Sequence, residues 1–312
     1  MSTHRDIIII GGGSAGLSAA QYSARSNLKV LVMEQMASGG QALLIDNLEN
    51  YPGFPDGING FEFSEKMEKQ ARKFGAEFLN CTVTSVEKDG DIFTVQSSKG
   101  LYTCSAVIYA TGAKHRHLGI PGEEELAGRG VSYCATCDGP FFQNKKILVV
   151  GGGDAACDES SYLSNLTDHL VHIHRKDRFR AQKSVADKVL KNPGIEVRFN
   201  HTLEEIIGDD KVTKVKLRKT DSREIYEEEM DAVFIFIGSI PQTSILQNIK
   251  KDEGGYIITN ENMETEIKGL FAVGDVRNTP FRQIIVSASD GAIAAHIASK
   301  FIDELRGQVY GK

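Results

Sequence analysis

Cys134 and Cys137, separated by two residues, lie between two copies of one glycine-rich motif. Each copy has the form Gly-x-Gly-x-x-small after an apolar run, the first beginning at Gly11 and the second at Gly151. Glycines at this spacing allow a tight turn and let the backbone approach a pyrophosphate, which binds at the N-terminus of the next helix. Two dinucleotide sites with a dithiol between them predict an electron relay, in which one nucleotide delivers electrons, one holds them and the cysteines pass them on.

The residue at the end of each expected second strand distinguishes the two nucleotide sites. Glu34 lies 23 residues after Gly11, where an acid binds a ribose 2′-hydroxyl. The equivalent residue in the second copy is Arg175, within a basic segment. Guanidinium and ammonium groups pair with a 2′-phosphate, which a carboxylate would repel. We therefore expect an unphosphorylated ribose in the first site and NADPH in the second, a solvated basic loop being the alternative.

A Cys-x-x-Cys pair can be a redox dithiol, half of a zinc site or two unrelated core cysteines. Zinc takes four ligands, and the sequence has no second Cys-x-x-Cys and no Cys-x-x-His, so we expect no metal. Asp138-Gly139-Pro140 follows directly, which predicts a short turn that ends there and not the long helix of a thioredoxin fold. A carboxyl at Asp138 can exchange the proton that dithiol reduction requires, although Asp-Gly is also a common turn pair.

Composition narrows the class of protein. The 312 residues are 41% hydrophobic with a formal net charge of −6, which is typical of a globular protein and argues against nucleic acid or an anionic membrane as the main partner. No stretch has the length of a signal-peptide core or a membrane span. Five cysteines, three of them isolated, predict no disulfide framework, and we expect a cytoplasmic enzyme with one special dithiol.

The elements that must position these residues alternate between strand and helix along the chain, which predicts an α/β fold. Apolar runs predict buried strands at 6–10, 29–34, 106–110, 170–174 and 270–273. Helices are expected after each glycine motif, ending near 26 in the first copy and spanning 155–165 in the second, and also at 61–74 and 283–305.

The chain resembles the bacterial low-molecular-weight thioredoxin reductases over essentially its whole length. The motifs that carry the resemblance are Gly11 to Gly16, Gly39-Gly40-Gln41, Glu49 to Gly53, Ala110 to Ala113, Gly130 to Gly139, Gly151 to Asp154, His174-Arg175-Lys176 with Arg180, Gly274-Asp275-Val276 and Arg282-Gln283. The resemblance implies two Rossmann-like, three-layer ββα domains. One is a discontinuous FAD domain over 1–115 and 245–312, and the other is an inserted NADPH domain over 116–244 that carries the dithiol.

The resemblance also implies the roles of individual residues. Cys137 would face the flavin, Cys134 would attack the disulfide of thioredoxin, and Asp138 would donate the proton. The FAD contacts implied are Gly11, Gly13, Ser14, Ala15, Gly16, Glu34, Gln35, Gly40, Gln41, Asn50, Val83, Ala110, Thr111, Gly112, Gly274, Asp275, Arg282, Gln283 and Ile284. The NADPH contacts implied are Gly151, Gly153, Asp154, Ala155, His174, Arg175, Lys176 and Arg180.

Thioredoxin is the partner that the resemblance implies, with a homodimer as the assembly. Phe141 and Phe142 beside the dithiol, with Arg129 nearby, are candidates for docking it, ordinary packing being the alternative for the aromatics. Lys176 stands where the family commonly has arginine, which keeps the charge but loses the planar fork and softens the expected preference for NADPH over NADH.

Four other classes of protein share part of this pattern of motifs. A ferredoxin-type NADP reductase lacks the Cys-x-x-Cys pair, and a ferredoxin-fed thioredoxin reductase lacks the basic cluster. A peroxiredoxin-linked reductase carries an additional N-terminal thioredoxin-like module, whereas this sequence begins at the first nucleotide-binding strand. A non-catalytic NADP(H) or thiol redox sensor keeps every motif but needs no rapid turnover.

Overall fold

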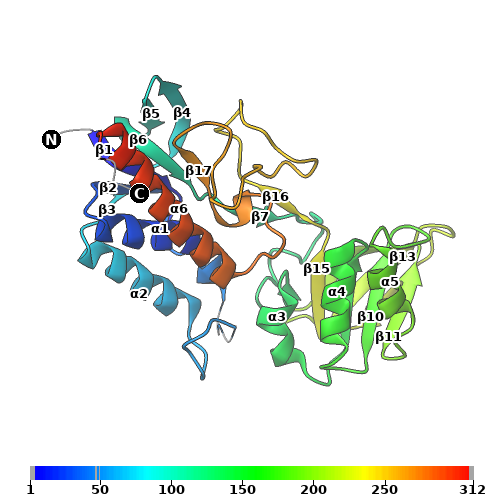
Figure 1. Cartoon of the computed structure of the whole chain (residues 1–312). Helices are drawn as coiled ribbons and strands as arrows, with labels where there is room; N and C mark the ends of the chain where they lie inside the picture. The colour runs from blue at the N-terminus through cyan, green and yellow to red at the C-terminus, as the bar shows by residue number, and fades with distance from the viewer. Residues whose placement is uncertain (1–3, 46–47, 49, 309–312) are drawn as a thin grey trace. The chain divides into compact units, whose positions relative to one another are not determined.

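The computed structural model describes residues 4–45, 48 and 50–308 (Figure 1). The chain divides into two compact units, Met1–Lys114 with Ile240–Lys312, and His115–Ser239. The second unit is thus an insertion in the sequence of the first. The chain enters and leaves it through β7 (Ala113–His115) and β16 (Ser239–Pro241), which pair as a two-stranded sheet.

The second boundary lies five residues before the expected one, because residues after Ser239 are bonded into the first unit. The hydroxyls of Tyr109 and Thr111 donate to the carbonyl oxygen of Gln242 at 2.8 and 2.7 Å. The side-chain amide of Gln242 donates in return to the carbonyl oxygen of Thr111 at 2.5 Å. These bonds attach the returning chain to the end of the strand that carries Tyr109.

The first unit is built on a seven-stranded sheet in the order β3-β2-β1-β6-β5-β4, with β17 also pairing β6. The strands are β1 (His4–Ile10), β2 (Val30–Glu34), β3 (Glu77–Asn80), β4 (Val83–Asp89), β5 (Ile92–Ser97), β6 (Gly100–Tyr109) and β17 (Leu270–Ala272). Strand β1 is buried on both faces, since Ile7 and Ile9 pack in one apolar cluster while Ile8 and Ile10 pack in another. A continuous apolar run is what a central parallel strand requires.

Helices α1 (Ser14–Arg25) and α6 (Ile284–Leu305) lie side by side on this sheet, with α2 (Gly60–Lys73) beside α1 (Figure 1). Small residues allow the close approach of α1 and α6, because a Cβ added to Gly291 would come within 2.1 Å of the carbonyl oxygen of Ala15. The expected helix 61–74 is present with both ends one residue earlier, and the expected helix 283–305 begins one residue later and ends as expected.

The second unit contains a five-stranded parallel sheet in the order β11-β10-β9-β15-β8 and a three-stranded antiparallel sheet, β12-β13-β14. Its strands are β8 (Val131–Ser132), β9 (Ile147–Gly151), β10 (Leu170–His174), β11 (Ile195–Phe199), β12 (His201–Ile207), β13 (Lys214–Lys219), β14 (Ile225–Glu229) and β15 (Ala232–Phe236). Helices α4 (Asp154–Leu163) and α5 (Lys183–Leu190) belong to this unit, and α4 ends two residues before the predicted 165. The α/β class with two Rossmann-type units is confirmed.

The cysteine pair lies at a short helix that ends at Asp138, as expected, although the chain does not leave the helical path there. Helix α3 (Ala135–Asp138) continues directly into the 3-10 helix η2 (Gly139–Phe142). Pro140 occupies the first turn of η2, where its missing N–H leaves no bond unmade. In the part of the chain that the structure describes, no helix is long and apolar enough to cross a membrane.

Candidate redox site and nucleotide-binding loops

Cys134 and Cys137 form a disulfide, with their Cα atoms 5.3 Å apart. Cys134 precedes the first residue of α3, and its Sγ lies 3.5 Å from the hydroxyl of Thr136. Both cysteines are partly exposed. The three other cysteines are buried, and burial raises the pKa of Cys104 to about 12, which keeps that thiol protonated and unreactive at neutral pH.

Asp138 is held beside the disulfide by the end of β8. The hydroxyl of Ser132 donates to Asp138 Oδ2 at 2.6 Å and accepts the backbone N–H of Cys134 at 3.1 Å. The N–H of Asp138 donates to the carbonyl oxygen of Cys134 at 3.1 Å, which closes the helical turn. The carboxyl is therefore fixed to the same turn as both sulfur atoms.

The first glycine loop connects β1 to α1, and its positions require glycine for different physical reasons. A Cβ at Gly11 would lie 2.4 Å from the carbonyl oxygen of Ala110, and one at Gly16 would lie 2.0 Å from that of Gly11. These two positions must be glycine for the loop itself to form. Gly13 has an ordinary extended conformation, and a Cβ there would meet no heavy atom within 4 Å. Nothing inside the unit requires glycine at Gly13, whereas a pyrophosphate against the N-terminus of α1 does.

In the second loop, between β9 and α4, one glycine is again required by the fold itself and another only by a bound ligand. A Cβ at Gly151 would lie 2.4 Å from the Cβ of Ala156, whereas one at Gly153 would meet no heavy atom within 4 Å. A Cβ at Gly152 would lie 2.2 Å from the imidazole of His174, which is buried directly beneath the loop. Asp154 and Ala155 form the exposed first turn of α4, and Asp154 accepts the backbone N–H of Gln182 at 2.6 Å.

The basic segment is attached to this second loop. The backbone N–H of Arg180 donates to the carbonyl oxygen of Gly152 at 2.6 Å, which fixes the segment after β10 against the glycine turn. The side chains of Arg175, Lys176 and Arg180 are exposed, and among the described residues none of them pairs with a carboxylate. Three cations without acidic partners beside a helix N-terminus fit the phosphates of NADPH.

Glu34 occupies the corresponding place in the first unit and is already bonded to the backbone. Its Oε2 accepts the N–H of Gly12 at 2.6 Å and its Oε1 accepts that of Met36 at 3.0 Å. Each carboxylate oxygen retains a second lone pair. Glu34 is thus held at the loop as an acceptor, and a ribose hydroxyl is a donor that fits it.

Most other predicted FAD contacts gather on segments around the first loop. Ser14 and Ala15 lie in the first turn of α1, and Gly40 and Gln41 in a 3-10 helix whose preceding Gly39 donates its N–H to the carbonyl oxygen of Gly12 at 2.8 Å. Gln41 donates through Nε2 to the carbonyl oxygen of Ala113. The stretch from Ala110 to Gly112 follows β6 and is bonded to Gln242, as described above.

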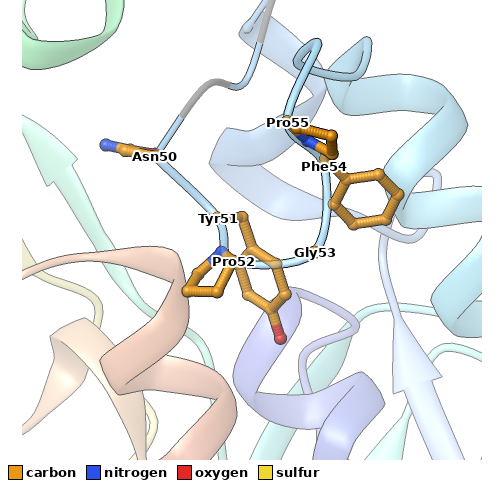
Figure 2. A pocket seen from close by; sticks show the side chains of 6 residues that line it. All are labelled: Asn50, Tyr51, Pro52, Gly53, Phe54 and Pro55. Atoms are coloured by element: carbon orange, nitrogen blue, oxygen red, sulfur yellow. The ribbon is translucent and has the colours of Figure 1, made fainter.

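The segment 50–55 lines a shallow hollow (Figure 2). Its aromatic side chains face Phe63 of α2, with ring centroids 4.7 Å away for Tyr51 and 5.9 Å for Phe54. Asn50 donates through Nδ2 to Oε1 of Gln283 at 3.0 Å, which connects this segment to the residue preceding α6. Glu49 lies outside the described residues.

Gly274 and Asp275 lie in a 3-10 turn that follows β17. Asp290 of α6 is 4% exposed and accepts the N–H of Gly274 at 3.0 Å. Burial raises the pKa of Asp275, and its Oδ1 has no hydrogen-bond partner in the described residues. A buried acceptor without a partner fits a hydroxyl-bearing ligand such as the ribityl chain. Arg282 lies over the ring of Tyr256, 4.1 Å from its centroid.

The remaining predicted residues differ in what surrounds them. Val83 begins β4 and packs against the core, Gln35 is exposed after β2, and Ile284 begins α6 beside the segment 50–55. Of the two aromatics after the dithiol, Phe141 is 54% exposed, whereas Phe142 packs edge-on against Phe234 at 5.9 Å. Arg129 is exposed and donates to the carbonyl oxygen of Glu125.

Three functional side chains were missed from the sequence. Ser132, Asp290 and Gln242 each bond to a predicted site residue or to its backbone. The only sequence signal for Ser132 is its place two residues before Cys134, and Asp290 and Gln242 act over separations that no local pattern reveals.

Two dinucleotide loops and a disulfide define a class of flavin-linked oxidoreductase. A family model described as pyridine nucleotide-disulphide oxidoreductase matches residues 5–292. The thioredoxin reductase of Treponema pallidum is 55% identical over 306 residues, 98% of this chain and 100% of the relative. That of Listeria innocua is 45% identical over 303 residues, 96% of this chain and 95% of the relative.

The same result comes from solved structures. The crystal structure of thioredoxin reductase from Streptococcus pyogenes matches with a TM-score of 0.90 at 40% identity, over 97% of this chain and 100% of that chain. The chain belongs to the pyridine nucleotide-disulphide oxidoreductases and, within them, to the thioredoxin reductase family.

Proposed function

We propose that the protein reduces the disulfide of thioredoxin, with electrons passing from NADPH to FAD, then to the Cys134–Cys137 disulfide and then to thioredoxin. The observation that carries the proposal is this disulfide, partly exposed, in the same compact unit as a dinucleotide loop bordered by three unpaired cations among the described residues. A ferredoxin-type NADP reductase needs no such disulfide.

The first unit is proposed to hold FAD. Gly13 allows the pyrophosphate to reach the N-terminus of α1, Glu34 accepts from the ribose, and Asp275 accepts from the ribityl chain. Bound FAD supplies two-electron chemistry between a nicotinamide and a disulfide. The N-terminus of α6, preceded by Arg282 and Gln283, brings a positive dipole end that favours an anionic reduced ring. Val83, Gln35 and Ile284 remain proposed contacts by family resemblance.

The second unit is proposed to hold NADPH. Gly153 allows the phosphates to approach α4, and Arg175, Lys176 and Arg180 pair with the 2′-phosphate. His174 supports the loop from beneath and is not an exposed ligand, because its imidazole fills the space under Gly152. Lys176 provides a point charge and lacks the planar, two-pronged guanidinium of arginine. We therefore propose that it discriminates against NADH less strongly than arginine would.

The dithiol is proposed to act by exchange. After reduction, the Cys134 thiolate attacks the disulfide of thioredoxin and forms a mixed disulfide, and Cys137 then attacks Cys134 and releases reduced thioredoxin. Asp138 holds the proton that one sulfur takes or gives. Phe141, exposed at the end of η2, is proposed to contact thioredoxin, with Arg129 as a charged neighbour and Phe142 as its packed support. A homodimer and a cytoplasmic location are proposed by family resemblance.

An anaerobic titration with NADPH tests the proposal. The holoenzyme should take up four electrons per chain, two in the flavin and two in the disulfide, and Cys134→Ser should take up two. The wild type should also reduce oxidised thioredoxin with NADPH, and the variant should not. A wild type that stops at two electrons would instead support a simple NADP-flavin reductase, and four-electron uptake without turnover would support a redox sensor.

A further inference from the structure

The hydroxyl of Ser132 has more partners within reach than it has protons. Ser132 ends β8 and is 4% exposed. Its Oγ lies 2.6 Å from Asp138 Oδ2, and 3.2 Å from the carbonyl oxygen of Cys134. The backbone N–H of Cys134 donates to the same oxygen at 3.1 Å. One donated proton therefore has two possible acceptors, and the nearer one is the carboxyl group.

The proposed function requires Asp138 to change its protonation state, and the present inference rests on that proposal. Reduction of the disulfide by two electrons, which bound FAD would supply, breaks the S–S bond and would leave each sulfur atom as a thiolate. A proton from Asp138 converts one sulfur to a thiol and leaves Asp138 ionised and the other sulfur a thiolate. When thioredoxin reoxidises the pair, the thiol returns its proton to Asp138 and the two cysteines close the disulfide again, while the two sulfur atoms of thioredoxin take their protons from solvent.

We propose that Ser132 is a positioning residue that supports both protonation states of Asp138. With the carboxylate ionised, the hydroxyl donates to Oδ2 across the 2.6 Å contact between the two oxygen atoms. With Asp138 protonated, its O–H donates to Ser132 Oγ, and the hydroxyl turns to the carbonyl oxygen of Cys134. The Ser132 hydroxyl, the bonded carboxyl oxygen and the N–H of Cys134 therefore each have a partner within reach in both states.

The burial of Ser132 makes its hydroxyl important for the protonation of Asp138. Because Ser132 is almost fully buried, water is not a ready substitute for its hydroxyl. A hydrogen bond to an ionised group is stronger than one to a neutral group, so removal of the hydroxyl weakens the ionised state of Asp138 more than the protonated state. Asp138 should then retain its proton to higher pH.

Other titratable groups border the same turn and must be separated in the test. Cys137 lies in α3 with Asp138 and Cys134 precedes its first residue, while α4, which packs on α3, carries Glu159 and Tyr162. Burial, with the nearby charge of Asp158, raises the pKa of Glu159 to about 7. The 3-10 helix η2 and the neighbouring strand β15 contain no titratable side chain. Glu159→Gln is therefore the control that removes the competing titration.

The test compares Ser132→Thr with Ser132→Val, two side chains of nearly the same shape of which only threonine has a hydroxyl. Holoenzyme is mixed anaerobically with one equivalent of NADPH, and the flavin's return to its oxidised absorbance, as electrons pass to the disulfide, is followed across pH. In Ser132→Val the pH at which this step slows should rise by about one to two units, and Ser132→Thr should restore the wild-type profile. Ser132→Ala, which adds no volume, repeats the comparison.

Two further measurements separate positioning from a general structural effect. The infrared band of a protonated carboxyl, absent in Asp138→Asn, should persist to higher pH in Ser132→Val. In an Asp138→Asn background Ser132→Val should have no further effect on the rate. Equal slowing at every pH and in both backgrounds would overturn the inference while leaving the proposed function intact. A wild type that takes up only two electrons would refute the proposed function itself.

Discussion

Gly153→Ala is expected to separate NADPH binding from every other property of the protein. Gly153 has φ −98° and ψ −178°, which alanine adopts without strain, and its Cβ would meet no heavy atom within 4 Å. Alanine restricts the unfolded chain, which stabilises a protein by about 0.4–1 kcal/mol, but it is a poorer N-cap residue than glycine by a comparable amount, so the two effects oppose each other. The stability of the folded protein should therefore change by less than about 1 kcal/mol.

The substitution should instead weaken the binding of the coenzyme. A methyl group at the N-terminus of α4 holds a phosphate away from the backbone N–H groups, and each charge-assisted hydrogen bond contributes about 1.5–3 kcal/mol. Loss of one or two such bonds amounts to about 3 kcal/mol, or roughly a hundredfold weaker binding. The assay is calorimetric titration of the oxidised holoenzyme with NADP⁺, with flavin content and the urea midpoint measured in parallel.

Two matched variants serve as controls. A Cβ at Gly13 would also meet no heavy atom within 4 Å, so Gly13→Ala should lose FAD and keep the affinity for NADP⁺ of the wild type. Gly152→Ala should destabilise the fold, because its Cβ would lie 2.2 Å from His174. Unchanged NADP⁺ binding in Gly153→Ala would refute the assignment of this loop to a dinucleotide.

The remaining predictions concern pH, coenzyme choice and docking. His172 is fully buried, and burial lowers its pKa to about 4, so between pH 4 and about 6.5 the unfolded chain binds more protons than the folded protein. The free energy of unfolding should therefore fall by about 3 kcal/mol as the pH drops through this window. Urea midpoints measured across the same pH range should lose that dependence in His172→Gln. Arg175→Gln should raise KM for NADPH about tenfold or more with little change for NADH, whereas Arg178→Gln, an equal charge change in the same loop, should leave the ratio of the two unchanged. Phe141→Ala should raise KM for thioredoxin severalfold without altering four-electron uptake, and Phe61→Ala, which alters a phenylalanine of similar exposure in α2, should affect neither.

The sequence predicts the strand-to-helix turns of the two glycine loops, because their geometry is local. Gly11 and Gly151 each mark a strand-to-helix turn whose geometry depends on a few consecutive residues, and the structure has both turns. The basic segment after 170–174 was found because the end of a strand places the next residues at the edge of the sheet.

Contacts that depend on distant residues could not be predicted. Gln242 bonds to Thr111 across 131 positions, and nothing in either local sequence shows this. Asp138-Gly139-Pro140 correctly marks the end of α3, but the sequence does not reveal the 3-10 turn that follows, which forms because Gly139 keeps helical angles. Helix α3 packs against α4, and the bond from Ser132 to Asp138 forms only where α3 brings the carboxyl beside the end of β8.

The contact between α1 and α6 has a consequence for how the protein is made. The chain emerges from the ribosome in order, so His115–Ser239 is complete while the first unit still lacks β17 and α6. A domain that is complete in sequence can fold during synthesis. The inserted unit is therefore able to fold first, and the turn that contains Gly274 and Asp275 reaches the first unit only afterwards. FAD is accordingly expected to be captured late, after translation has passed the α6 residues that cover Ala15.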